Sequence, residues 1–269
     1  MGALRISLFW FLMISMALAN ENPDVAHIAL PRPLVMEYPA ENGNEDVRMK
    51  CTSWRVAAEA NNLRPWKAVP GECGGYVKDY MTGKGYESDV ALVSEEARVY
   101  ARSVELGGDG KDAWVFDVDE TLISNLPYYS QHGFGLEVFD GVEFDKWVEK
   151  GRGPAINSSL KLYQEIKELG FKAFLLTGRS DRHREVTEEN LVNAGFQDWD
   201  KFILRSAEDH VKSAAVYKSE KRREMVEDGF RIVGNSGDQW SDLVAVGPTA
   251  PSSISQRSFK LPNPMYYIP

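Results

Sequence analysis

The sequence predicts an α/β fold: a doubly wound, Rossmann-like parallel sheet with a short cap insert and an N-terminal helical extension. From Ala113 onward, short apolar runs alternate with segments in which apolar residues recur at helical spacing. The runs are typical of strands buried on both faces of a parallel sheet. Gly170, Gly195 and Gly229 end the intervening helices. This alternation predicts a parallel sheet with helices on both faces.

The composition is that of an ordinary globular protein. The chain has 269 residues, of which 43% are hydrophobic and 26% charged, and this excludes disordered and fibrous classes. Its length permits one large domain, or one domain with an appendage. With 31 basic and 40 acidic residues the net charge is -9, so the surface should repel phosphate backbones and we expect no nucleic-acid partner.

The N-terminus, residues 1–19, is typical of a cleaved signal peptide. Arg5 precedes the apolar run Leu8–Leu18, and Ala17–Ala19 fits the small-x-small cleavage pattern. The alternative is a membrane anchor, but the run is shorter than the ~20 apolar residues needed to span a bilayer. We therefore expect a chain that enters the secretory pathway and has no membrane partner. In that oxidising compartment Cys51 and Cys73, the only cysteines, predict a disulfide.

An arm and a helical extension are expected before the sheet. Residues 20–50 are rich in Pro, Asn and Glu and predict an extended arm. In the extension, residues 51–110, apolar spacing predicts a helix over Cys51–Leu63, and prolines and glycines break the stretch 65–75 into loops. A second, amphipathic helix is predicted over Ser88–Leu106, where a glycine-rich segment ends it.

The expected core covers residues 111–269 and is interrupted by an insert at about 122–153. The aromatic residues of the insert, such as Tyr129, Phe139 and Phe144, indicate either core packing or a small cap over the site. The strands are predicted at Ala113–Val118, Lys172–Leu176, Phe202–Leu204, Phe230–Val233 and Ser258–Leu261, and the helices at Ile156–Ile166, Asp181–Ala194 and Ser219–Asp228.

Polar residues follow several of these strands, at the edge of a parallel sheet where ligands bind. Asp117 and Asp119 follow the first strand, and carboxylates this close repel each other unless a cation or proton is shared. Lys218 is expected at the start of a helix, where the dipole disfavours a cation unless an anion is shared with it. Singly, each residue fits an ordinary turn or surface position. Jointly they predict a site, which Thr177, Asp238 and Asp242 complete.

Phosphoryl transfer is the chemistry that needs this set of groups. Magnesium takes oxygen ligands, typically a few carboxylates together with substrate phosphate and water. One aspartate can then attack phosphorus, while a second acid protonates the leaving alcohol and later activates water. A hydroxyl group, backbone amides and a lysine can bind the phosphoryl oxygens.

Four motifs follow one another along the chain, and they are Phe116–Thr121, Leu176–Arg179, Tyr217–Arg222 and Gly234–Asp242. They resemble the ordered motifs of the haloacid dehalogenase (HAD) superfamily, and more narrowly those of the plant acid phosphatase and vegetative storage protein family. The similarity runs from about Cys51 to the C-terminus, and its specificity lies in the order of the motifs rather than in any one of them.

The resemblance implies a HAD-like fold and a role for each matching residue. Asp117 would be the nucleophile and a magnesium ligand; Asp119 would be the general acid/base and would give its main-chain carbonyl to the metal. The remaining residues fall into two sets: Thr177, Gly178 and Lys218 would hold the phosphoryl group, and Asp238 and Asp242 would complete the metal site.

The function implied by the resemblance is a magnesium-dependent acid phosphatase, extracellular or vacuolar, that hydrolyses phosphate monoesters through an aspartyl-phosphate. One alternative is a vegetative storage protein with weak or no activity. Some storage members lack the nucleophilic aspartate, whereas this sequence keeps Asp117. Another alternative is phosphotransfer to a second alcohol, which shares the covalent intermediate.

Two weaker signals concern the surface and the specificity. Asn157 begins the only glycosylation sequon, but Ser158 could instead cap a helix and bury Asn157. The short insert predicts an open site with broad specificity for small or aromatic alcohols that rest against Tyr128, Tyr129 or Phe134. A homodimer is compatible with the sequence, which carries no signal for or against it.

Overall fold

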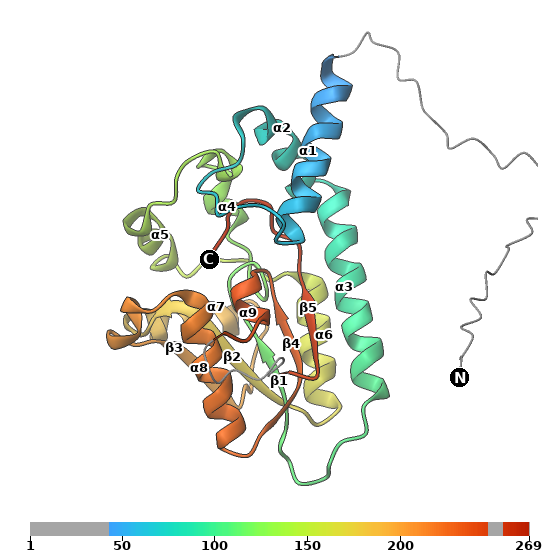
Figure 1. Ribbon diagram of the computed structural model, residues 1–269. Helices are drawn as coiled ribbons and strands as arrows, with labels where there is room; N and C mark the ends of the chain where they lie inside the picture. Colours follow the sequence, from blue (N-terminus) through green and yellow to red (C-terminus); the bar gives the residue numbers. More distant parts are fainter. Residues whose placement is uncertain (1–42, 247–254, 269) are drawn as a thin grey trace, which may run out of the picture. The chain divides into compact units, whose positions relative to one another are not determined.

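The computed structural model describes residues 43–246 and 255–268, and within them the strands form one five-stranded parallel sheet (Figure 1). The predicted signal peptide and residues 20–42 of the predicted arm lie outside the described residues. None of the helices within the described ranges has the length and apolar character that crossing a membrane requires.

The sheet has the order β3-β2-β1-β4-β5, which confirms the predicted α/β fold. Because β1 lies between β2 and β4, the chain reverses its direction of strand addition at β1, and ligands bind at such switch points. Val115 of β1 pairs with Phe174 of β2 and with Asn235 of β4. The strands are β1 (Asp112–Phe116), β2 (Lys172–Ser180), β3 (Lys201–Arg205), β4 (Arg231–Gly237) and β5 (Arg257–Lys260).

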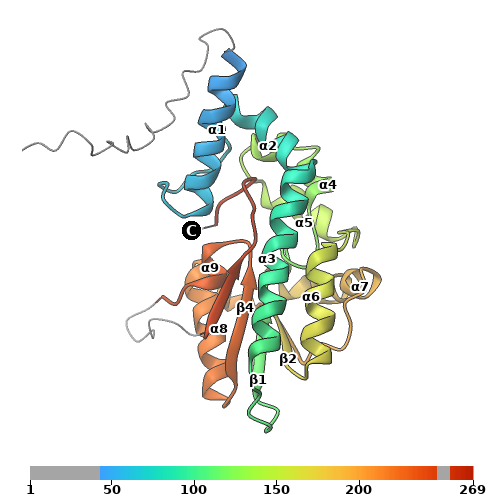
Figure 2. The ribbon, with the colours of Figure 1, turned by 90° about the vertical axis from the view of Figure 1, so that its right-hand side faces the viewer.

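Helices cover both faces of the sheet, as the alternation of elements predicts (Figure 2). Trp114 of β1 packs in one buried cluster with residues of α3, α6 and α7, whereas Val115 faces Tyr217 and Met225 of α8. This opposite orientation of successive side chains follows from the two-residue period of a strand. The helices are α3 (Lys84–Ser103), α6 (Asn157–Glu168), α7 (Arg184–Asn193) and α8 (Ala214–Glu227).

The N-terminal extension and the insert share a second apolar core. Tyr128 and Phe134 of the insert are buried in it with Val77 of the extension and Met265 near the C-terminus. The insert is therefore packed against the extension as well as lying near the strand ends. The α-helices of the insert are α4 (Leu126–Tyr129) and α5 (Gly141–Val148). The extension contributes α1 (Gly43–Glu59) and α2 (Gly74–Met81) to this core, whereas its third helix, α3, packs on the sheet.

A disulfide joins Cys51 of α1 to Cys73, directly before α2, which confirms the predicted pairing. Both residues are fully buried in the second core. The bond closes a loop with a sequence separation of 22 residues.

Reduction of the disulfide should lower the melting temperature without abolishing catalysis at moderate temperature. Closing a loop of this size stabilises the folded protein by roughly 3 kcal/mol in the chain-entropy model. The Cys51–Cys73 bond is not part of the strand ends where the predicted site lies, so catalysis should not depend on it. Calorimetry with and without reductant measures the effect, and a variant carrying Cys51→Ser and Cys73→Ser provides the matched control. Free thiols titrating in the native, unreduced protein would rule out the disulfide.

The structure corrects two predictions in the N-terminal part. The extended arm is wrong over residues 43–50, which are the first turns of α1, and that helix ends at Glu59 rather than at Leu63. The predicted loop over residues 65–75 extends too far, because α2 already begins at Gly74. Gly74 does not break this helix: it is the first residue of α2 and packs closely against Leu136, whose side chain would have to move if a Cβ were added there.

Two further corrections concern elements that carry motif residues. α8 begins at Ala214 rather than Ser219, because Ser213 caps it by accepting the N–H of Val216. Lys218 therefore lies in the second turn, and the expected conflict with the helix N-terminus is wrong. β2 and β4 are longer than predicted and continue through the polar ends of their motifs, to Ser180 and Gly237.

Candidate active site

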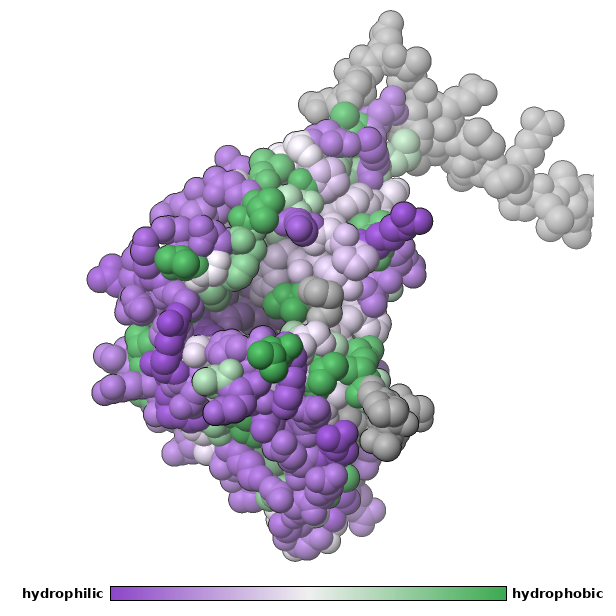
Figure 3. Space-filling model, turned by 60° about the vertical axis from the view of Figure 1, so that its left-hand side comes forward, coloured by the Kyte–Doolittle hydropathy of each residue, from purple (hydrophilic) through white to green (hydrophobic). Residues whose placement is uncertain are grey.

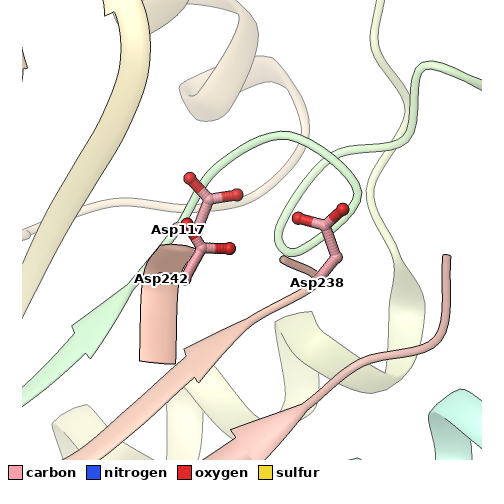
Figure 4. Close-up of side chains that lie close together, drawn as sticks. All are labelled: Asp117, Asp238 and Asp242. Carbon is pink, nitrogen blue, oxygen red and sulfur yellow. The ribbon is translucent and has the colours of Figure 1, made fainter. Parts of the chain in front are cut away.

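Three predicted metal ligands converge at the carboxyl ends of the sheet (Figure 4). Carboxylate oxygens of Asp117, Asp238 and Asp242 all lie within 4.8 Å of one another, and all three residues are buried. Asp117 follows β1, Asp238 follows β4, and Asp242 belongs to α9 (Trp240–Leu243). The site thus lies where the strand order reverses.

Backbone contacts between β1 and β4 fix the position of Asp117. Its N–H donates to the carbonyl of Ser236 at 3.0 Å, and the Thr121 hydroxyl donates to its carboxylate at 3.3 Å. Gly237 allows the next turn to approach, because a Cβ there would lie 2.3 Å from the Cβ of Asp242. The glycine of this motif is therefore required by the contact between β4 and α9.

A reciprocal cap holds Asp242. Its carboxylate accepts the N–H of Gln239 at 2.9 Å, while the side chain of Gln239 accepts a backbone N–H of α9. Asn235 donates to the Asp242 carbonyl at 2.7 Å, and Arg222 donates to the same atom.

The C-terminal segment reaches the site through Asn263. The amide of Asn263 donates to the Asp238 carboxylate at 2.7 Å, and the Gln239 amide donates to the same oxygen at 2.7 Å. These two bonds orient Asp238 toward the other carboxylates.

Lys218 is the cation that pairs directly with this cluster. Its ammonium lies 2.5 Å from Asp117 Oδ1 and also pairs with Asp242. Burial opposes the charge, but the two aspartates outweigh it and raise the pKa of Lys218. The side chain is 7% exposed, so the ammonium is held against the carboxylates with little water around it.

The carboxylates themselves are under-neutralised. Burial, together with repulsion from Asp242, raises the pKa of Asp117 well above its usual value. The same causes raise the pKa of Asp238 to about 6. Among the described residues, three buried carboxylates face the Lys218 ammonium and the buried Arg222 guanidinium, and together these groups carry a net negative charge. Such a charge is costly in a buried site unless a further cation is bound. An all-oxygen set of this kind fits magnesium.

Asp119 is oriented differently from the other three. Its carboxylate forms a salt bridge with Arg179, with the shortest contact at 2.7 Å, and accepts the Asn125 amide at 2.8 Å. Burial alone would raise the pKa of Asp119, but Arg179 outweighs it and the pKa is lowered. The structure does not place this carboxylate in the metal cluster, and the predicted contact through its main-chain carbonyl stays a prediction.

Thr177 and Gly178 lie at the end of β2, beside Asp119. The Thr177 hydroxyl is buried, accepts the N–H of Arg179 at 3.1 Å and lies 3.5 Å from the Asp119 carboxylate. Gly178 is exposed, and a Cβ there would meet nothing within 4 Å. Of the seven residues predicted for the active site, all but Thr177 line one cavity of about 1110 Å³, namely Asp117, Asp119, Gly178, Lys218, Asp238 and Asp242.

The family model of the HAD superfamily, subfamily IIIB (acid phosphatase), matches residues 36–269. The chain belongs to this acid phosphatase family. It is 61% identical over 265 residues to "Acid phosphatase 1" of Solanum lycopersicum, which covers 98% of this chain and 100% of that protein. It is also 40% identical over 221 residues to "Vegetative storage protein 2" of Arabidopsis thaliana, covering 81% of this chain and 80% of that protein. The predicted family resemblance is confirmed.

A class C acid phosphatase from Bacillus anthracis has a similar fold. Its structure superposes with a TM-score of 0.57 and covers 81% of this chain and 87% of that one. At 19% identity the similarity supports the HAD-like fold alone.

Several residues of this acid phosphatase-family site were missed in the sequence. Arg179 stands in a motif but was assigned no role, although its position two residues after Thr177 was a usable signal. Asn125 and Asn263 had no local signal, because each acts through a contact made only in the folded chain.

The predicted sequon lies on the surface. Asn157 is the exposed first residue of α6, and the N-cap position is Ile156, so the alternative in which Ser158 caps the helix and buries Asn157 is wrong. Glycosylation of Asn157 stays a prediction.

Proposed function

We propose that the protein is a magnesium-dependent acid phosphatase that hydrolyses phosphate monoesters through an aspartyl-phosphate on Asp117. The observation that carries the proposal is the convergence of Asp117, Asp238 and Asp242 around Lys218 at the strand ends. Membership of the acid phosphatase family supports the same reaction.

In the first step, an Asp117 oxygen attacks phosphorus and the bond from phosphorus to the ester oxygen breaks. The Lys218 ammonium, 2.5 Å from Asp117, is placed to balance charge on the phosphoryl oxygens as they approach. Thr177 and Gly178 would bind the same oxygens from the end of β2. Asp119, oriented by Arg179, would give its proton to the departing alcohol oxygen. Because Arg179 lowers the pKa of Asp119, the protonated form that this step needs is populated only at acid pH.

In the second step, the Asp119 carboxylate takes a proton from water as that water attacks the phosphorus of the aspartyl-phosphate. The bond from phosphorus to Asp117 breaks, inorganic phosphate is released, and the Asp117 carboxylate is restored. Arg179 holds Asp119 in the same position for both proton transfers.

Asp117, Asp238 and Asp242 would hold the magnesium ion, with a main-chain contribution from Asp119. When bound, magnesium neutralises the charge of substrate phosphate and of the developing transition state. Asn263 and Gln239 would keep Asp238 in its ligating orientation through their hydrogen bonds.

A storage role with weak or no activity is the second candidate, because a vegetative storage protein is among the relatives. Retention of Asp117, Asp119, Lys218 and the acidic cluster favours catalysis. We also propose that the mature chain is extracellular or vacuolar and carries a glycan at the exposed Asn157, since the N-terminus is typical of a signal peptide.

Removal of the metal should abolish hydrolysis of an aryl phosphate such as p-nitrophenyl phosphate, and added magnesium should restore it. The physical reason is that the buried carboxylates would otherwise repel the anionic substrate. Release of p-nitrophenol, measured after chelation and again after titration with magnesium, provides the test. Undiminished turnover in the chelated enzyme would contradict the metal dependence. No turnover at any magnesium concentration would favour the storage role, and phosphorylated acceptor beside free phosphate would indicate phosphotransfer.

A further inference from the structure

The cavity that contains the candidate active site extends well beyond the phosphoryl-binding residues. Its volume is about 1110 Å³, whereas sites for drug-sized ligands typically enclose ~300–1,000 Å³. Figure 3 shows a hollow on this face, with hydrophobic side chains around it. The predicted open site for small alcohols therefore underestimates the space available to a leaving group.

One wall of this cavity is apolar and is built from the insert and the C-terminal segment. Tyr129 of α4 stacks on Tyr266 with ring centroids 5.2 Å apart. Phe144 and Val148 of α5 continue the same wall. All three aromatic residues predicted to contact the leaving group, Tyr128, Tyr129 and Phe134, are buried in the second core, and only Tyr129 also lines the cavity.

The apolar wall continues outward to the rim, where large side chains are left in water. Phe139 is 56% exposed, Val142 is 66% exposed and Ile268 is 39% exposed, and all three line the cavity. The Phe139 ring lies 5.4 Å from that of Phe144, so the rim and the wall form one surface. An apolar surface that runs from the phosphoryl site to the solvent is typical of a ligand site rather than of scattered exposed residues.

The opposite wall is polar, and its arginines make contacts within the protein. Arg179 pairs with the general acid candidate, and Arg182 pairs with Asp145 of α5. The Arg205 guanidinium lies over the Tyr217 ring, 5.0 Å from its centroid, although its buried Nε has no hydrogen-bond partner among the described residues. The continuous surface that runs from the phosphoryl site to the rim is the apolar wall.

We propose that the site is adapted to amphiphilic phosphate monoesters, in which an unbranched apolar chain of several carbons is attached to the phosphate. The inference rests on the proposed function and specifies its substrate class. The phosphoryl group lies at Asp117 and Lys218, and the chain runs along Tyr129 and Phe144 to the rim at Phe139 and Val142. The reaction is unchanged: the bond from phosphorus to the ester oxygen breaks, and the long-chain alcohol leaves with the proton from the general acid.

A series of n-alkyl phosphates with methyl, butyl and octyl chains, each below its micellar concentration, tests the inference. Burial of one methylene group is worth up to about fourfold in binding, so kcat/KM should rise at least about tenfold from butyl to octyl even with half-buried chains. The rise should lie in KM, because the chain contacts are the same in the ground and transition states. Equal kcat/KM values across the series would overturn the inference while leaving the proposed phosphatase function in place.

The variant Phe139→Ser/Val142→Ser should flatten this dependence on chain length and lower the octyl-to-butyl ratio of kcat/KM at least about threefold. Val138→Ser is the matched control, since Val138 is 64% exposed in the same segment but does not line the cavity. An equal fall of the octyl-to-butyl ratio in Val138→Ser would overturn the assignment of Phe139 and Val142 to the chain-binding wall.

Calorimetric binding of the matching alkylphosphonates, which are not hydrolysed, gives a readout that does not depend on turnover. Affinity that rises more steeply with chain length in wild type than in the double variant supports the apolar wall. If affinity rises in this way but none of the esters is hydrolysed, the proposed function fails and the binding inference stands. Affinity independent of chain length overturns the inference.

Discussion

Asp117→Asn is expected to lower turnover by at least about 10,000-fold, because loss of a catalytic nucleophile has effects of this size or larger in other covalent mechanisms. The amide of asparagine is a poor nucleophile, and the other residues of the site cannot form the acyl-phosphate bond in its place. The fold should remain intact. Burial and the repulsion from Asp242 already disfavour the charged form of Asp117, so its neutral isostere should leave the melting temperature of the metal-free protein unchanged or slightly raised.

The matched control is Asp112→Asn, at the opposite end of the same strand. Asp112 is buried and pairs with Arg231, so its loss should lower stability and leave turnover of the folded enzyme unchanged. Steady-state hydrolysis of p-nitrophenyl phosphate and thermal unfolding of both variants separate the two effects. Near-normal hydrolysis by Asp117→Asn would remove this residue as the nucleophile.

Asp238→Asn is expected to weaken magnesium binding by more than about 100-fold, because loss of partners that merely orient a ligand already costs about 10–100-fold. Because Asn263 and Gln239 both donate to one Asp238 oxygen, the asparagine would keep its carbonyl oxygen there and turn its NH₂ group, which cannot bind a cation, toward the metal site. Activity should therefore fall at low magnesium and recover in part at high magnesium. Magnesium titration by calorimetry and by activity measures both.

Asn263→Ser provides a graded control for Asp238. It removes one hydrogen bond to the carboxylate but keeps the ligand, so magnesium affinity should fall by about 10–100-fold, less than in Asp238→Asn. If Asp238→Asn loses activity that excess magnesium never restores, and its magnesium affinity is unchanged, the ligand assignment is wrong.

The features that the sequence predicted well depend on local patterns. The apolar run before Asp117 and the glycines after the helices mark where strands and helices follow one another along the chain. Parallel strands then bring their carboxyl ends to one edge of the sheet. Lys218 was identified from its motif, but its place in α8 was wrong, because the cap at Ser213 lies before any apolar periodicity. The polar ends of β2 were not recognised as strand for a similar reason: Thr177 to Ser180 interrupt the apolar run.

The features that could not be predicted depend on contacts between distant segments. Asn263 reaches Asp238 only because β5 carries the C-terminal segment back over the strand ends. Tyr128 and Tyr129 are both buried in the second core, but only Tyr129 also lines the cavity, where its ring stacks on Tyr266 of the C-terminal segment. Nothing in the local sequence distinguishes the two tyrosines.

The covalent intermediate is the central claim, and it can be observed directly. Enzyme quenched in acid during turnover of a monoester, then digested and analysed by mass spectrometry, should carry one phosphoryl group on the peptide that contains Asp117. The adduct should be absent from Asp117→Asn and should be lost on treatment with hydroxylamine, as expected for an acyl-phosphate. A phosphoryl group on any other residue, or a burst of product with no adduct, would contradict the account.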